Sequence, residues 1–165
     1  MRSRLGITIW LAVLAIAVGM LMTSTASGQK QRVVHVVVPL QDIRAKVVDH
    51  NRDGLRLGDQ IAARGSLLDE SQTDRVGTAY LQCLVHKRII EPNRGLWNCN
   101  YVLELADGEI MLQGLDPRGP GVYEMAVLGG TGAYAGANGD ATFTDVGTEG
   151  VDANPHTDIV VRLSD

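Results

Sequence analysis

Glu104 is the side chain whose sequence context best suits acid–base chemistry. It is the one acidic residue in the strongly apolar stretch Trp97–Leu105. A carboxyl group that points into an apolar interior has a raised pKa, because desolvation disfavours its charged form, and it can then act as a general acid or base. We therefore take Glu104 as the candidate catalytic residue. A carboxylate that points into solvent is the alternative, and it is the commoner arrangement for glutamate.

Aromatic residues make up only 4% of the chain. Rings that are so scarce either fill the core or line a pocket, and a pocket lined by rings suits an apolar small molecule. Core filling is the alternative for each of them. The candidate ligand-binding residues are Tyr80, Trp97, Tyr101, Tyr123, Met125 and Phe143.

The N-terminus has the pattern of a secretion signal. Arg2 and Arg4 precede an uncharged apolar run that ends at Met22, and small and polar residues follow it. This order predicts a signal peptide over residues 1–26, cleaved after Ala26, and a secreted single domain over residues 27–165. An uncleaved N-terminal anchor is the alternative.

The charge of the mature chain excludes two kinds of partner. Removing Arg2 and Arg4 from the 15 basic residues leaves 13 against 19 acidic ones. Such an acidic surface repels phosphate backbones and anionic lipids. We therefore expect no nucleic-acid partner and no stable membrane association after signal cleavage.

Cys83 and Cys99 both lie in the part that is predicted to be exported, where a cysteine pair is more often a disulfide than two thiols. A metal site is the weaker alternative, because neither cysteine belongs to a CxxC motif. The histidines do not add ligand spacing, since they are scattered along the chain at His35, His50, His86 and His156. We expect a Cys83–Cys99 disulfide and no metal.

The cysteine pair also predicts a strand register. If the two cysteines face each other across an antiparallel hairpin, Leu81 lies opposite Tyr101, and the cysteine face is apolar throughout. The same register puts Glu104 opposite Thr78 on a mixed polar face. This placement favours the solvent-exposed alternative for the Glu104 carboxylate.

Two motifs resemble ligand-binding loops, but each is better interpreted as a structural turn. Asp49–Gly54 matches the first half of an EF-hand loop, but the twelfth position is Gln60 instead of glutamate, so a β-turn is favoured and calcium stays an alternative. The glycine-rich run 129–139 lacks the Lys-Ser/Thr of a phosphate-binding loop. Its glycines instead predict a tight, close-packed crossing of the chain.

Short β-rich runs separated by turn formers recur along the mature chain, and they predict an all-β fold. With so little helix available, a barrel or a sandwich is the economical way to cover the strand edges. The expected strands are Val33–Val38, Gln60–Leu68, Val76–Lys87, Trp97–Leu105, Glu109–Leu115, Val122–Leu128, Asp140–Val146 and Asp158–Leu163.

Four elements in order resemble the barrel proteins that group plant dirigent proteins with allene oxide cyclases and their bacterial relatives. They are Leu67-Leu68-Asp69, Val76-Gly77-Thr78, the run 110–114, and Val127–Tyr134 with Gly139 downstream. The resemblance implies a single eight-stranded antiparallel β-barrel, often a homotrimer, whose apolar lumen holds a small molecule. It also implies cyclase or isomerase activity, the steering of a ring closure or coupling without a cofactor. Ala135 and Asn138 depart from the dirigent pattern, so the resemblance supplies an architecture and no active site.

Three functions are consistent with these observations. The first is a secreted, cofactor-free barrel that binds an apolar small molecule and directs its isomerisation or cyclisation. The second is an extracellular carrier or sensor of an apolar ligand. The third is a structural wall protein that forms a trimer. The first requires a polar group inside the lumen, and the third requires a filled interior.

Overall fold

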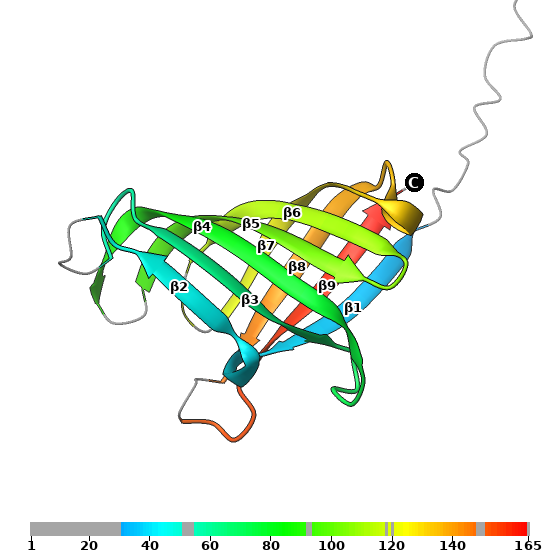
Figure 1. The fold of residues 1–165 in the computed structure, drawn as a ribbon, viewed down its shortest axis with the longest axis horizontal. Helices are drawn as coiled ribbons and strands as arrows, with labels where there is room; N and C mark the ends of the chain where they lie inside the picture. Colours follow the sequence, from blue (N-terminus) through cyan, green and yellow to red (C-terminus); the bar gives the residue numbers. More distant parts are fainter. Residues whose placement is uncertain are drawn as a thin grey trace, which may run out of the picture.

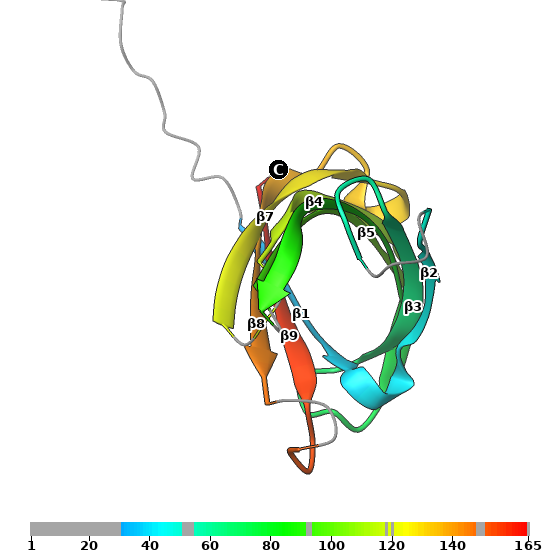
Figure 2. The same cartoon turned by 90° about the vertical axis from the view of Figure 1, so that its left-hand side faces the viewer.

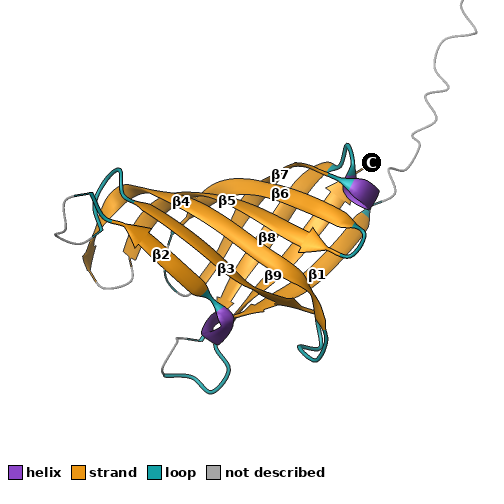
Figure 3. Cartoon of the chain, viewed as in Figure 1, coloured by secondary structure: helices purple, strands orange, loops and turns teal. Residues whose placement is uncertain are grey.

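The computed structural model describes residues 31–50, 55–91, 94–117, 119, 121–147 and 151–164. These residues form mostly β-strands, with two short 3-10 helices at turns among them (Figures 1 and 3). The strands are β1 (Arg32–Pro39), β2 (Arg44–Val48), β3 (Gln60–Leu68), β4 (Arg75–Glu91), β5 (Arg94–Leu105), β6 (Gly108–Asp116), β7 (Gly121–Gly130), β8 (Asn138–Val146) and β9 (His156–Ser164), and the 3-10 helices are η1 (Leu40–Asp42) and η2 (Gly132–Tyr134).

The strands close into a barrel. Their order is β1-β9-β8-β7-β6-β5-β4-β3-β2, and each neighbouring pair is antiparallel. β1 also pairs with β3, where Val37 lies opposite Leu68, and this contact completes the ring that Figure 2 shows end-on. The expectation of an all-β fold with an eight-stranded antiparallel barrel is therefore confirmed.

β2 is the strand that the sequence did not predict. It pairs with the same edge of β3 as β1 does, next to the β1–β3 contact that closes the ring of eight, and its five side chains are all exposed. Because it is short and presents no buried apolar face, it lacks the alternation by which strands are recognised. β1 and β2 share β3 as a partner, and η1 separates them, so the two behave as one strand with a helical turn inserted.

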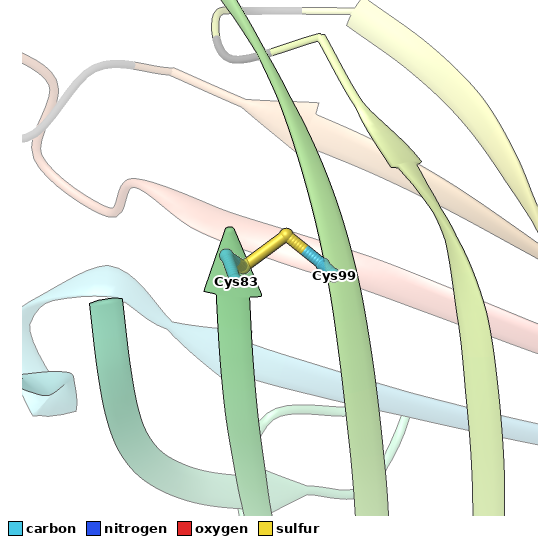
Figure 4. The surroundings of a disulfide bond; sticks show 2 residues. All are labelled: Cys83 and Cys99. Atoms are coloured by element: carbon cyan, nitrogen blue, oxygen red, sulfur yellow. A yellow bond between two sulfur atoms is a disulfide. The ribbon is translucent and has the colours of Figure 1, made fainter. Parts of the chain in front are cut away.

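The hairpin of β4 and β5 confirms both the disulfide and its register. Cys83 and Cys99 are bonded across the two strands (Figure 4). Leu81 lies opposite Tyr101 as expected, and the register holds as far as the pair Val85 and Trp97, beyond which β4 bulges.

The alternation of side chains along a strand decides which of them face the interior of the barrel. Residues i and i+2 share a face, so on the eight strands of the ring one row of side chains faces the interior and the other faces outward. On β5 the exposed row includes Asn100 and Glu104. The buried row of that strand, each member at most 8% exposed, is Trp97, Cys99, Tyr101 and Leu103.

The glycine-rich run after β7 is a tight crossing, as its composition predicts. Gly132 has a φ of 57°, and a Cβ there would collide with the backbone oxygen of Asp107. A Cβ on Gly139 would collide with the carbonyl of Arg162 on β9. Only glycine permits these approaches.

The predicted signal peptide, residues 1–26, lies outside the described residues. Among the residues that are described, no helix is long and apolar enough to cross a membrane.

Candidate functional site

Three aromatic rings pack against one another inside the barrel, and we call them the aromatic cluster: Tyr101 on β5, Tyr123 on β7 and Phe143 on β8. The ring centres of Tyr123 and Phe143 are 5.1 Å apart, with the planes nearly parallel at 16°. Those of Tyr101 and Phe143 are 5.0 Å apart at 55°. Strand pairing sets this geometry, since Tyr123 and Phe143 lie opposite each other across β7 and β8.

Two carboxylates share the interior face with these rings. Asp116, the last residue of β6, is only 1% exposed and lies opposite Trp97, itself 5% exposed. Asp145 on β8 is half-buried and accepts a hydrogen bond of 2.7 Å from the Thr157 hydroxyl on β9. Acidic side chains are rarely fully buried, so Asp116, with Asp145 on the same interior face, marks a candidate site.

The electrostatics of this region keep the Tyr123 phenol neutral. Burial raises the pKa of the Tyr123 phenol far above its ordinary value of 10.0. The neighbouring Tyr101 and then the carboxylates of Asp116 and Asp145 raise this pKa further. The two phenol hydroxyls are also hydrogen-bonded to each other. Tyr123 is therefore a persistent hydrogen-bond donor beside two carboxylate acceptors.

The polar groups of the candidate site lie towards one end of the barrel. Asp116 and Asp145 stand at or near the ends of β6 and β8, and Tyr123 and Thr157 near the starts of β7 and β9. Tyr123, Asp145 and Thr157 are half-buried, whereas Phe143, two residues deeper on β8, is fully buried. The arrangement offers an apolar ring surface with polar groups at its outer end.

The disulfide belongs to a layer of paired interior residues next to the aromatic cluster. This layer runs from Cys99 through Gly114 and Met125 to Ala141. Met125 is 3% exposed, and a Cβ on Gly114 would lie 2.7 Å from its Cγ. The small residues of this layer leave room for the methionine chain and for the rings of the next layer.

Two of the candidate residues lie on the other face of the barrel wall. Tyr80 is 43% exposed on β4, and its hydroxyl donates a 3.2 Å hydrogen bond to Glu104, which is exposed on β5. Both side chains point outward, because their positions are odd steps from the cysteines that fix the interior row. The outward position of Glu104 is the one that the cysteine register favours, whereas the expectation that Tyr80 lines the lumen is wrong, and neither residue belongs to the candidate site. The others, Trp97, Tyr101, Tyr123, Met125 and Phe143, are interior.

Sequence reasoning missed Asp116 and Asp145, although a signal for the first was present. The short Ala106-Asp107 turn fixes the register of the next hairpin, and that register carries the interior row of β5 onto Asp116. Extending the cysteine register by one strand therefore identifies the buried carboxylate.

A second buried acid, Asp59, has a structural role. Its carboxylate accepts hydrogen bonds from the backbone N–H groups of His50, at 3.1 Å, and Arg56, at 2.7 Å. These bonds tie the loop between β2 and β3. The stretch 51–54 of the calcium-like motif lies outside the described residues, and within the described part of the chain no group of three or more potential ligands is arranged to hold a metal.

No protein-family model and no curated protein sequence matches the chain. Solved structures do match it. A pyocyanin demethylase shares 23% identity with a TM-score of 0.59, over 80% of this chain and 99% of its own. The pterocarpan synthase dirigent protein PsPTS1 shares 16% identity with a TM-score of 0.66, over 82% and 95%. AbnU, an exo-specific intermolecular Diels-Alderase, shares 17% identity with a TM-score of 0.57, over 80% and 98%. These likenesses show that the chain shares its barrel fold with a dirigent protein and a Diels-Alderase, as the sequence resemblance predicts.

Proposed function

We propose that the protein binds an apolar, ring-containing small molecule inside the barrel and directs its isomerisation or cyclisation without a cofactor. The observation that carries this proposal is the buried Asp116 carboxylate, together with the neutral phenol of Tyr123, beside an aromatic cluster. The names of the proteins that share the fold, a demethylase, a pterocarpan synthase and a Diels-Alderase, support a small molecule as the ligand.

The proposed mechanism rests on shape and on two kinds of polar group. Phe143 and Tyr101 offer flat surfaces that hold a flexible or planar substrate in one conformation, which removes much of the entropic barrier to ring closure. The Tyr123 hydroxyl donates a hydrogen bond to an oxygen on which negative charge develops. Asp116 accepts the proton that an isomerisation moves, and returns it to another atom of the same molecule.

The carrier function uses the same aromatic cluster and leaves the carboxylates without a chemical role. Its support is the apolar majority of the interior, in which Phe143, Leu112 and Ile159 are each at most 1% exposed. The two functions share a binding step and differ in whether the bound molecule changes. They are therefore separated by analysing the ligand after incubation.

Trp97 provides the readout for the binding experiment. The sequence has two tryptophans, Trp10 and Trp97, and only Trp97 belongs to residues 27–165. We propose to titrate the mature protein with 1-aminoanthracene, a neutral, planar probe, and to follow Trp97 emission and probe emission together. We expect saturable quenching of Trp97, weaker binding to Tyr123→Phe, and unchanged binding to the outward control Tyr80→Phe.

The same preparation tests the chemistry. Native mass spectrometry identifies any small molecule that purifies with the barrel, and chromatography of the released molecule shows whether it changes on standing. If neither this molecule nor 1-aminoanthracene is bound by the folded wild-type protein, the interior is filled and both ligand-based functions are wrong.

We also propose that the barrel works outside the cytoplasm as a single domain after cleavage of residues 1–26. The Cys83–Cys99 disulfide supports this location, because such bonds persist in oxidising compartments. N-terminal sequencing of the exported protein is expected to begin at Ser27, whereas a retained anchor leaves Met1 in place. The proposed homotrimer is tested on the same sample by light scattering.

A further inference from the structure

A polar groove of about 350 Å³ opens on the outer face of the barrel, across β2, β3 and β4. The groove faces outward, whereas the aromatic cluster on β5, β7 and β8 lies inside the barrel. Asp42 is the one carboxylate in its lining. The groups that give the groove its character are three guanidinium groups and three hydroxyls, from Arg44, Arg64, Arg75, Ser66, Thr78 and Tyr80.

Strand register places these groups together. Arg64 lies opposite Arg44 on one side and opposite Tyr80 on the other, and Ser66 lies opposite Thr78. Like charges directly opposite each other on neighbouring strands destabilise a sheet. The Arg44–Arg64 pair therefore has an unfavourable interaction that a bound anion would relieve.

None of the three arginines is neutralised by a carboxylate of the described residues. Arg44 donates to the backbone oxygens of Gln41 and Ile43, at 3.1 and 3.3 Å. Arg75 donates to the backbone oxygen of Gly77, at 3.2 Å, and to the Thr78 hydroxyl, at 3.0 Å. The Arg64 guanidinium makes no hydrogen bond or ion pair with another residue of the described ranges.

Arginines elsewhere on the surface behave differently. Arg32 pairs with Asp107 at 2.9 Å, and Arg162 pairs with Asp140 at 3.1 Å. The chain has 19 acidic residues against 15 basic ones, so carboxylates are plentiful on this protein. The groove therefore gathers three guanidinium groups that form no ion pair within the described residues, on a protein with more acidic than basic residues.

We propose that this groove binds a phosphate or sulfate group, either as the free dianion or as the ester of a small molecule. Guanidinium groups present paired N–H donors that match the oxygens of such anions. Arg64 stands between Arg44 and the hydroxyl-bearing strand β4, so it is the central anion-binding residue. Ser66 and Thr78 supply further hydroxyl donors, and the volume suits a small ester.

Isothermal titration calorimetry of the mature protein tests the proposal, with inorganic phosphate, inorganic sulfate and phenyl phosphate at constant ionic strength. Arg64→Gln is the test variant, and Arg162→Gln is its control, because it removes the same charge from a paired arginine on the outer face. We expect wild type and Arg162→Gln to bind alike, and Arg64→Gln to bind about tenfold more weakly or worse. Phenyl phosphate that binds more tightly than both inorganic anions identifies an ester as the ligand, and equal binding identifies the free dianion.

Urea denaturation provides a second measurement. Without phosphate, Arg64→Gln is expected to be at least as stable as wild type, because the Arg44–Arg64 repulsion is gone. With phosphate, wild type and Arg162→Gln gain stability and Arg64→Gln gains less. The proposal is overturned if wild type shows no saturable heat with any of the three anions, or if Arg64→Gln and Arg162→Gln respond to them equally.

Discussion

Gly114→Ala tests how tightly the interior is packed next to the aromatic cluster. A Cβ at this position would lie 2.7 Å from Met125 Cγ, and 3.1 Å from both the Glu124 backbone oxygen and Met125 Cα. Overpacking of a core costs roughly 1–3 kcal/mol. The lower backbone entropy of alanine in the unfolded chain offsets roughly 0.4–1 kcal/mol of this. We therefore expect a net loss of about 1–2 kcal/mol in the free energy of unfolding.

A double-mutant cycle assigns this loss to one contact. Met125→Ala removes the Cγ atom and costs roughly 2–5 kcal/mol by itself, because Met125 is buried. In that background Gly114→Ala meets only the two contacts at 3.1 Å, so its cost falls towards zero. The coupling energy is then about 1 kcal/mol or more.

Urea denaturation with Trp97 emission as the signal measures all four proteins of the cycle, with the disulfide kept oxidised. Thermal unfolding provides a second measurement. In a chain of this size, each kcal/mol of lost stability lowers the unfolding temperature by roughly 2–4 °C. A Gly114→Ala protein as stable as wild type, or a cycle that is additive within error, would falsify the tight approach of β6 and β7 at this layer.

Three further outcomes follow from other contacts. Replacing Cys83 and Cys99 together by alanine is expected to lower the free energy of unfolding by roughly 3 kcal/mol, because the crosslink closes a loop of 16 residues in the unfolded chain, and urea midpoints that match those of wild type contradict this. Burial, followed by the hydrogen bond to Asp107, raises the pKa of Tyr134 to about 12. The folded state therefore holds this proton more tightly than the unfolded state, and stability falls as pH rises from about 10 to about 12; Tyr134→Phe should flatten that fall in thermal unfolding against pH. Gly132→Ala places a side chain at a φ of 57° against the Asp107 backbone oxygen, so it should lower the unfolding temperature by several degrees, through a loss of roughly 1–2 kcal/mol.

The sequence was sufficient to predict the strands of the barrel ring and one of its registers. Alternation identified eight strands because each of them has a buried row, and the cysteine pair fixed β4 against β5. β2 was not predictable in this way, since all of its side chains are exposed. Its position depends on η1, which bends the chain back onto β3.

The candidate site was predicted only in part. The cysteine register places Trp97 and Tyr101 on the buried row of β5. Glu104 was selected for its apolar neighbours in sequence, and these say nothing about the face on which it lies. Sequence neighbours alternate across a strand, so the residues that surround a side chain in space are its cross-strand partners. Asp116 has Trp97 as that partner, and this relation requires the register of a second hairpin.

A substitution at Asp116 distinguishes the enzyme function from the carrier function, because only the enzyme function uses the buried carboxylate. Placing a carboxylate in an apolar interior costs free energy, and the carrier function assigns it no chemical task. Asp116→Asn keeps the shape of the side chain and removes the carboxylate that would accept a proton, so the variant is expected to stay folded and to preserve 1-aminoanthracene binding. Conversion of the native ligand should fall by about 100-fold or more, the usual contribution of a general base. If conversion is unaffected while binding persists, the carboxylate has no catalytic role and the carrier function is favoured. If stability and probe binding are both lost instead, Asp116 is a structural acceptor whose hydrogen bonds hold the end of β6, and the proposed catalytic role is wrong.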